Sequence, residues 1–219
     1  MVEIPGPIPG GTISFGENFM VSQLVALVVL FFVIIDPLAS FAVFFVNTKQ
    51  YKNNTKINIA ILAVIIAAVL SYLVLFFGEQ LLQLFSTDIN SFRIAGGIIL
   101  IILGINMALG KSVIDVEKKN VDSAQAIASI IATPLLTGPA TITAILVSSA
   151  DYGKMLTGIA IGIVLLTTGF LLYLSVVFQN LTLKAKTAIQ LTSTILGLIT
   201  LAWGVNYILT GIQAIFNLI

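Results

Sequence analysis

Two short segments place polar residues and prolines inside otherwise apolar runs. The first, IDPLAS at residues 35–40, puts the carboxylate of Asp36 directly before Pro37. The second, TPLLTGPAT at residues 133–141, combines two prolines and a glycine with three threonines. Proline removes an N–H donor and clashes with the preceding helical turn, so each segment predicts a break in a helix.

The half-helix after each break would begin with N–H groups that have no backbone partner and carry about half a positive charge. Carbonyls freed by the break could hold a cation. If the two breaks meet, they form a compact site for a small zwitterion. We therefore expect substrate contacts from Pro37, Leu38, Ala39 and Ser40 at the first break, and from Thr133, Thr137, Gly138, Pro139, Ala140 and Thr141 at the second.

Asp36 has a separate expected role. A carboxylate at membrane depth is costly and usually lies on an ion or proton path. The chain has no histidine, so Asp36 is the obvious titratable group inside the apolar runs. We expect it to couple transport to protons, with sodium as the alternative ion. A purely structural role as the helix N-cap for residues 38–40 is the other interpretation, and both roles can hold together.

The composition makes the lipid bilayer the expected solvent. Of 219 residues, 58% are hydrophobic and only 9% are charged, whereas a soluble domain has about a quarter charged. The net charge of +1 gives no reason to expect a nucleic-acid partner. Metal-ligand clusters, Ser-His or Cys-His pairs and phosphate-binding glycine loops do not occur in the sequence, so we expect no enzyme, cofactor or metal.

The apolar runs are long enough to cross a membrane, which takes about 20 helical residues. We predict six spans, at residues 19–46, 57–77, 94–109, 124–149, 155–177 and 188–209. The two breaks fall in the first and fourth spans. Residues 1–18 are expected to form an irregular extracellular tail, and residues 111–122, KSVIDVEKKNVD, a charged cytoplasmic loop.

Basic residues indicate the orientation. Positive charge stays in the cytoplasm, and eight lysines follow the first, third and fifth spans, against Arg93 and Lys154 on the other side. Both termini are therefore predicted to be extracellular. Arg93, with Glu79 and Asp88, is interpreted as a solvated helix end near a membrane face, with a minor role in gating as the alternative.

An internal repeat relates the two halves. GIILIILGINMAL at 97–109 matches GLITLAWGVNYIL at 197–209 without a gap, with Gly97, Gly104, Asn106 and Leu109 among the identical positions. In the broken spans, Asp36 aligns with Thr137, Ala39 with Ala140 and Ser40 with Thr141. Halves of three spans each, 19–110 and 123–219, must enter the membrane in opposite orientations, as in many secondary transporters. Chance similarity between apolar helices is the alternative.

The matched asparagines Asn106 and Asn206 have two interpretations. They line the site, or they join helices through side-chain hydrogen bonds. Small residues on the third and sixth spans would suit a homo-oligomer as well as packing within one chain.

Three segments carry a resemblance to a known family. IDPLASFAVFF, FRIAGGIILIILG and TPLLTGPATITAIL resemble the MarC family of six-span membrane proteins, and the likeness covers nearly all of the chain beyond residue 18. The chain looks especially like archaeal members described as small neutral amino acid transporters. Here Leu38-Ala39-Ser40 replaces the commoner glycine and asparagine after the proline, and Ala140 replaces a glycine.

The expected protein is all-α, with six transmembrane helices in two inverted three-helix repeats. The resemblance implies transport of glycine and alanine driven by the proton gradient. We predict a secondary transporter that holds its substrate between the two breaks at the bilayer midplane. A cation channel or ion exchanger that uses the same broken helices is the alternative.

Overall fold

A computed structural model describes residues 12–110, 127–129, 132, 136–177 and 183–216. The residues outside these ranges include 1–11 of the expected tail, the whole charged loop 111–122 and Thr133. The helices are α1 (Thr12–Ile35), α2 (Pro37–Asn47), α3 (Asn53–Leu84), α4 (Ile89–Ala108), α6 (Pro139–Tyr152), α7 (Lys154–Val177) and α8 (Leu183–Phe216).

Five stretches in the described ranges are long and apolar enough to cross a membrane. They are Phe19–Asn47, Asn53–Leu84, Ile89–Ala108, Lys154–Val177 and Thr187–Phe216, and they match five of the six expected spans. The fourth expected span, 124–149, is described only in part, and α6 forms its second half. A total of six crossings therefore stays a prediction.

The expected irregular tail is wrong over its last residues, because α1 already begins at Thr12. The physical reason lies in the positions of the helix breakers. Prolines and the Gly10-Gly11 pair end at residue 11, and the segment from Thr12 onward contains only Gly16 as a poor helix former.

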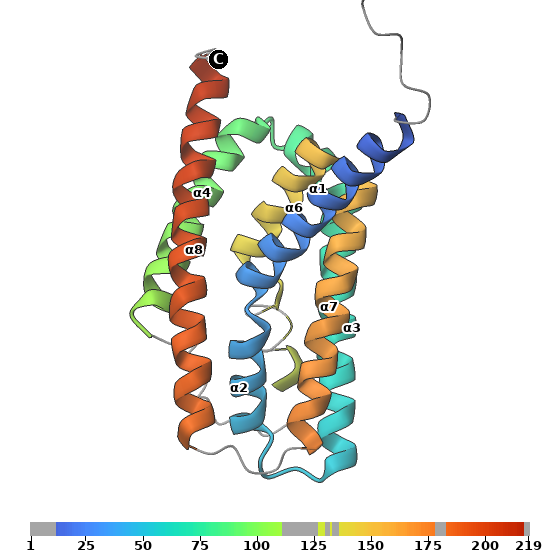
Figure 1. Ribbon diagram of the computed structural model, residues 1–219, viewed down its shortest axis with the longest axis vertical. Coiled ribbons are helices and arrows are strands. Elements are labelled where there is room, and N and C mark those ends of the chain that lie inside the picture. Colours follow the sequence, from blue (N-terminus) through green and yellow to red (C-terminus); the bar gives the residue numbers. More distant parts are fainter. Residues whose placement is uncertain (1–11, 111–126, 130–131, 133–135, 178–182, 217–219) are drawn as a thin grey trace, which may run out of the picture.

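The helices form two outer pairs with the broken helices between them (Figure 1). The pair α4 and α8 lies on one side, and the pair α3 and α7 on the other. Both α2 and α6 begin near mid-height, but α6 runs toward the end where the chain terminates and α2 toward the opposite end (Figure 1). Each half-helix packs against helices of the other half: α2 against α7 and α8, and α6 against α3 and α4.

Glycines bring α4 and α8 into close contact. A Cβ added at Gly97 would lie 2.6 Å from the carbonyl oxygen of Gly204, and one at Gly104 would lie 2.7 Å from that of Gly197. Small residues at such crossings let backbones approach in a membrane, where lipid supplies no hydrophobic drive for association.

The α4–α8 contact has the symmetry that the repeat predicts. Residue n on α4 corresponds to residue n + 100 on α8. This relation converts the contact of Gly97 with Gly204 into the contact of Gly197 with Gly104. The neighbours obey the same rule, since Gly204 faces Ile101 and Gly104 faces Leu201. This local twofold relation favours an inverted repeat over chance similarity for this helix pair, while the relation between the complete halves stays a prediction.

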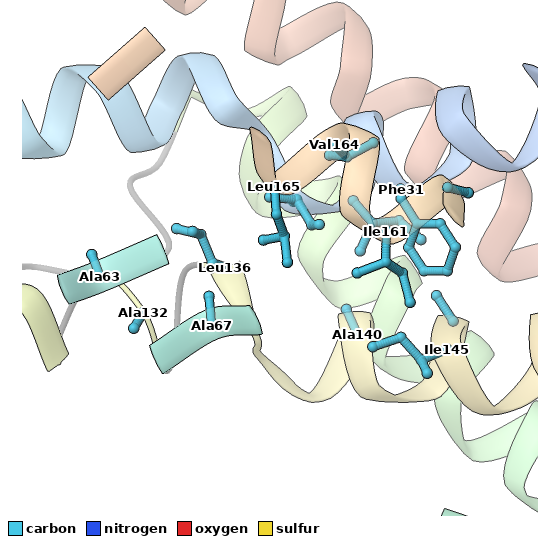
Figure 2. Packing of buried hydrophobic residues seen from close by; sticks show 14 of the residues in the cluster. Phe31, Ala63, Ala67, Ala132, Leu136, Ala140, Ile145, Ile161, Val164 and Leu165 are labelled. Carbon is cyan, nitrogen blue, oxygen red and sulfur yellow. The ribbon is translucent and has the colours of Figure 1, made fainter. Parts of the chain in front are cut away.

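Apolar side chains cover both the inside and the outside of the molecule. Figure 2 shows the interior, where residues of α1, α3, α6 and α7 meet, among them Phe31, Ala67, Ala140 and Ile161. Large apolar residues such as Leu166, on α7, are also exposed on the outer surface. An exposed apolar exterior is what a bilayer requires, because lipid tails solvate such side chains as well as a protein core does.

Candidate functional site

The first break lies at Asp36, between α1 and α2, as predicted. Asp36 has φ 43° and ψ 72°, in the left-handed region that aspartate tolerates better than most residues. Its Oδ1 accepts a hydrogen bond of 3.1 Å from the N–H of Ala39, so the N-cap interpretation is confirmed. Pro37 occupies the first turn of α2 and has no N–H for the carbonyl of Val33, one turn earlier.

The surroundings of Asp36 are buried. The Asp36 side chain is 6% exposed and Ser40 is fully enclosed, with the Ser40 hydroxyl donating to the Asp36 carbonyl over 3.1 Å. The hydroxyl of Ser193 on α8 lies against the Asp36 carboxyl. The Ser193 Oγ is buried and makes no hydrogen bond of ordinary geometry within the described ranges. This corner therefore holds a buried carboxylate with a serine hydroxyl against it.

The second break lies before α6, also as predicted. The N–H of Thr137 donates to the carbonyl of Ala132, five residues back, over 3.0 Å. Such a widened turn is uncommon and recurs at functional sites. The Thr137 hydroxyl lies 3.4 Å from the carbonyl of Ala67 on α3. Thr137 therefore ties the interrupted segment to α3 and is buried with it.

The start of α6 differs from the start of α2 in its capping. Gly138 has no side chain to cap the helix, and the first intrahelical bond joins the N–H of Ile142 to the Gly138 carbonyl. The N–H groups of Ala140 and Thr141 precede that bond and carry the positive end of the helix dipole. Both residues are buried. The start of α6 is therefore suited to an anion, whereas a carboxylate already occupies the start of α2.

Ser71 is a further polar residue near the second break. It lies one helical turn beyond Ala67 on α3, which the Thr137 hydroxyl contacts. Ser71 is fully buried, and its Oγ has no hydrogen-bond partner in the part of the chain that the structure describes. Neither Ser71 nor Ser193 was expected from the sequence, because single serines are common within apolar spans.

The two helix starts also correct the repeat alignment by one residue. Asp36 precedes Pro37 as the N-cap of α2, and Gly138 precedes Pro139 as the N-cap of α6. Asp36 therefore corresponds structurally to Gly138 rather than to Thr137. The sequence alignment had paired Asp36 with Thr137, but the prolines determine where each helix begins.

Not every expected contact residue faces the interior. Pro37 and Gly138 are buried, and Leu38 and Ala39 half-buried, but Pro139 is exposed. Asn206 is also exposed and does not line the site in this structure. Its neighbour Tyr207 belongs to the buried face of α8, and a helix turns by about 100° per residue. Asn106 is half-buried, and its expected role stays a prediction.

The space beside the second break is filled. The helices surrounding the two breaks are in contact with one another, since α1 packs against α6 and α7 packs against both α2 and α6. Figure 2 shows Ile161 near Ala140 and Phe31, and Leu136 near Ala67 and Ala132. The expectation of a small wet pocket is therefore not met at this point, where apolar side chains enclose the break.

These features define a class of protein. Backbone interruptions at membrane depth are tolerated only where protein or water surrounds them, and both breaks are enclosed by helices. Interrupted helices at mid-height, running in opposite directions, are typical of transporters. The chain is a multi-pass integral membrane protein with a transporter-like arrangement of helices.

The chain belongs to the MarC family, because the model described as "MarC family integral membrane protein" matches residues 21–216. The UPF0056 membrane protein MJ1677 of Methanocaldococcus jannaschii is 29% identical over 83% of this chain and 92% of its own length. YhcE of Escherichia coli, also a UPF0056 membrane protein, is 29% identical over 84% and 89%. No solved structure matches the chain.

Proposed function

We propose that this protein is a secondary transporter of small neutral amino acids, with glycine and alanine as the first candidates. The observation that carries the proposal is the unequal pair of half-helix starts inside the molecule. One start holds the carboxylate of Asp36, and the other has no side-chain cap. The resemblance to small neutral amino acid transporters of the MarC family supports the choice of substrate.

The unequal capping determines how a zwitterion would bind. At α2, the N–H of Ala39 is already bonded to the Asp36 carboxylate, so this end attracts a cation. At α6, the N–H groups of Ala140 and Thr141 attract an anion. The substrate's carboxylate would bind at α6, with the Ser71 hydroxyl as a further donor. Its ammonium group would face Asp36 and the carbonyl that Pro37 leaves without a donor.

The size of the substrate follows from the packing. Leu136 and Ile161 lie at the second break (Figure 2), and each is fully buried. Interiors this dense resist added volume, at a cost of roughly 1–3 kcal/mol for extra methylenes. An amino acid with no side chain or a single methyl group would disturb this packing least.

The proposal also covers coupling and orientation. Asp36 would take up a proton with the substrate, with sodium as the alternative coupling ion. Both chain ends would face the outside, as the lysine distribution indicates. The protein would act without catalysis or a cofactor.

Counterflow of radiolabelled glycine into proteoliposomes tests the function, with proton and sodium gradients imposed separately. We expect the wild type to exchange glycine. We expect Asp36→Asn to show no glycine uptake when a proton gradient is imposed. Asp88→Asn is the matched control, because Asp88 also caps a helix, α4, but is exposed at its end. Absence of glycine counterflow in the folded wild-type protein would refute the proposal.

A cation channel or ion exchanger is the second candidate. The observation that favours it is the buried Asp36 carboxylate with the Ser193 hydroxyl against it, because oxygens of this kind can ligate a bare cation. Thermal unfolding distinguishes the two. Protection by glycine at constant salt supports the amino-acid transporter, and protection by sodium or potassium chloride alone supports the channel.

A further inference from the structure

An ion pair between a buried arginine and a partly exposed aspartate lies at the end of α6 that is far from the break. The guanidinium of Arg93 on α4 lies 2.5 Å from Oδ1 of Asp151 on α6, and the two side chains are 11% and 38% exposed. Arg93 is therefore not the solvated helix end that the sequence suggested. The pair joins the last turn of the half-helix to the long α4–α8 pair.

Two further polar groups surround this ion pair. The hydroxyl of Tyr207 on α8 lies against Ser148 on α6, near both charges, and both residues are buried. Within the described ranges, the Arg93 Nε has no hydrogen-bond partner. Burial of Arg93 costs desolvation free energy that cancels part of the gain from the ion pair. Asp151 stays partly exposed, and the unbonded Arg93 Nε lowers the gain further. The ion pair therefore contributes little to the free energy of unfolding, and its geometry is better suited to stabilising one conformation of α6.

The other half lacks this arrangement in the residues that the structure describes. The relation between α4 and α8, n to n + 100, places Ser193 where the first half has Arg93. Ser193 is uncharged and lies against Asp36, at the start of α2 rather than at its end. Near the end of α2, Asn47 and Thr48 donate to carbonyls of their own helix. Thus α4 contacts the end of α6 through an ion pair, whereas α8 contacts the start of α2 through the hydroxyl of Ser193.

We propose that Arg93 and Asp151 form a latch that positions the end of α6 and closes the face of the molecule where the chain terminates. Figure 1 shows α6 ending toward that face. This inference rests on the proposed transport function, because transport requires the face to open. Opening would separate Asp151 from Arg93 and expose the buried surface of α6 around Ser148.

Thiol labelling tests the latch without any substrate. The chain has no cysteine, so Ser148→Cys introduces one thiol at a position that is 1% exposed. In this background we expect Asp151→Asn to raise the rate of labelling by a membrane-impermeant maleimide about tenfold. The substitution leaves the buried charge of Arg93 without its partner, which destabilises the closed position of α6. The exchanged pair, Arg93→Asp with Asp151→Arg, should return the rate toward that of the Ser148→Cys protein.

A neighbouring ion pair provides the matched control. Lys154 at the start of α7 lies 3.5 Å from Glu79 near the end of α3, and both side chains are more exposed than Arg93. Lys154→Gln should leave the labelling of the thiol at position 148 unchanged. Unchanged labelling in a folded Asp151→Asn protein would overturn the latch, and so would an equal increase in Lys154→Gln. The labelling reaction contains no glycine, so its result does not depend on the outcome of the transport assay.

Discussion

Replacing Gly97 by alanine should weaken the α4–α8 crossing. The added Cβ would lie 2.6 Å from the carbonyl oxygen of Gly204 and 2.7 Å from Cγ1 of Ile208. The first distance is about 0.8 Å short of an ordinary contact of 3.4 Å, and the obstructing atom is backbone. The helices must separate, and overpacking of this kind costs roughly 1–3 kcal/mol. We expect a midpoint of thermal unfolding lower by several degrees.

The fluorescence of Trp203 is a suitable probe for this measurement. It is the only tryptophan, it adjoins Gly204 on α8, and it packs partly against the core. Gly169→Ala is the control, because its nearest neighbour is a side-chain methyl of Val64 at 3.3 Å. Because both glycines belong to one contact, Gly204→Ala should cost about as much as Gly97→Ala, and the double variant less than the sum. Wild-type stability in Gly97→Ala would refute the close crossing and the symmetry drawn from it.

Three other predictions concern the second break and the topology. Ala140→Leu should raise the glycine concentration needed for half-maximal counterflow, whereas Ala150→Leu, on the exposed end of the same helix, should leave it unchanged. Thr137→Val should lower the free energy of unfolding by about 1 kcal/mol, measured by chemical denaturation, because it removes one long hydrogen bond to Ala67. A tag at the C-terminus should react with antibody on intact cells; reaction only after permeabilisation would contradict the proposed orientation.

Local signals predicted the interruptions correctly. Proline cannot donate within a helix, so the helix starts at Pro37 and Pro139 could be located from sequence alone. The matched glycines on the third and sixth spans indicated close helix packing, but they did not indicate that α4 and α8 pack against each other. The alignment of the first break with the second differed by one residue from the alignment of the two helix starts, because it was based on similar side chains.

Contacts between distant segments were not predictable in the same way. Arg93 looked like a solvated end because its partner, Asp151, lies 58 residues further along the chain. Ser193 had no feature that distinguished it from neighbouring hydroxyl residues until α8 was placed beside Asp36. Asn206 was expected near the site because it matched Asn106, but a match in sequence does not determine which face of a helix a side chain occupies.

The central claim is that both half-helix starts contact the same small amino acid. Cysteines introduced singly as Ala39→Cys and Ala140→Cys test it, with Ala150→Cys as the exposed control. The account predicts that glycine slows alkylation at positions 39 and 140 over one range of concentrations and leaves position 150 unaffected. Protection at only one of the two breaks, or at neither, would contradict the account.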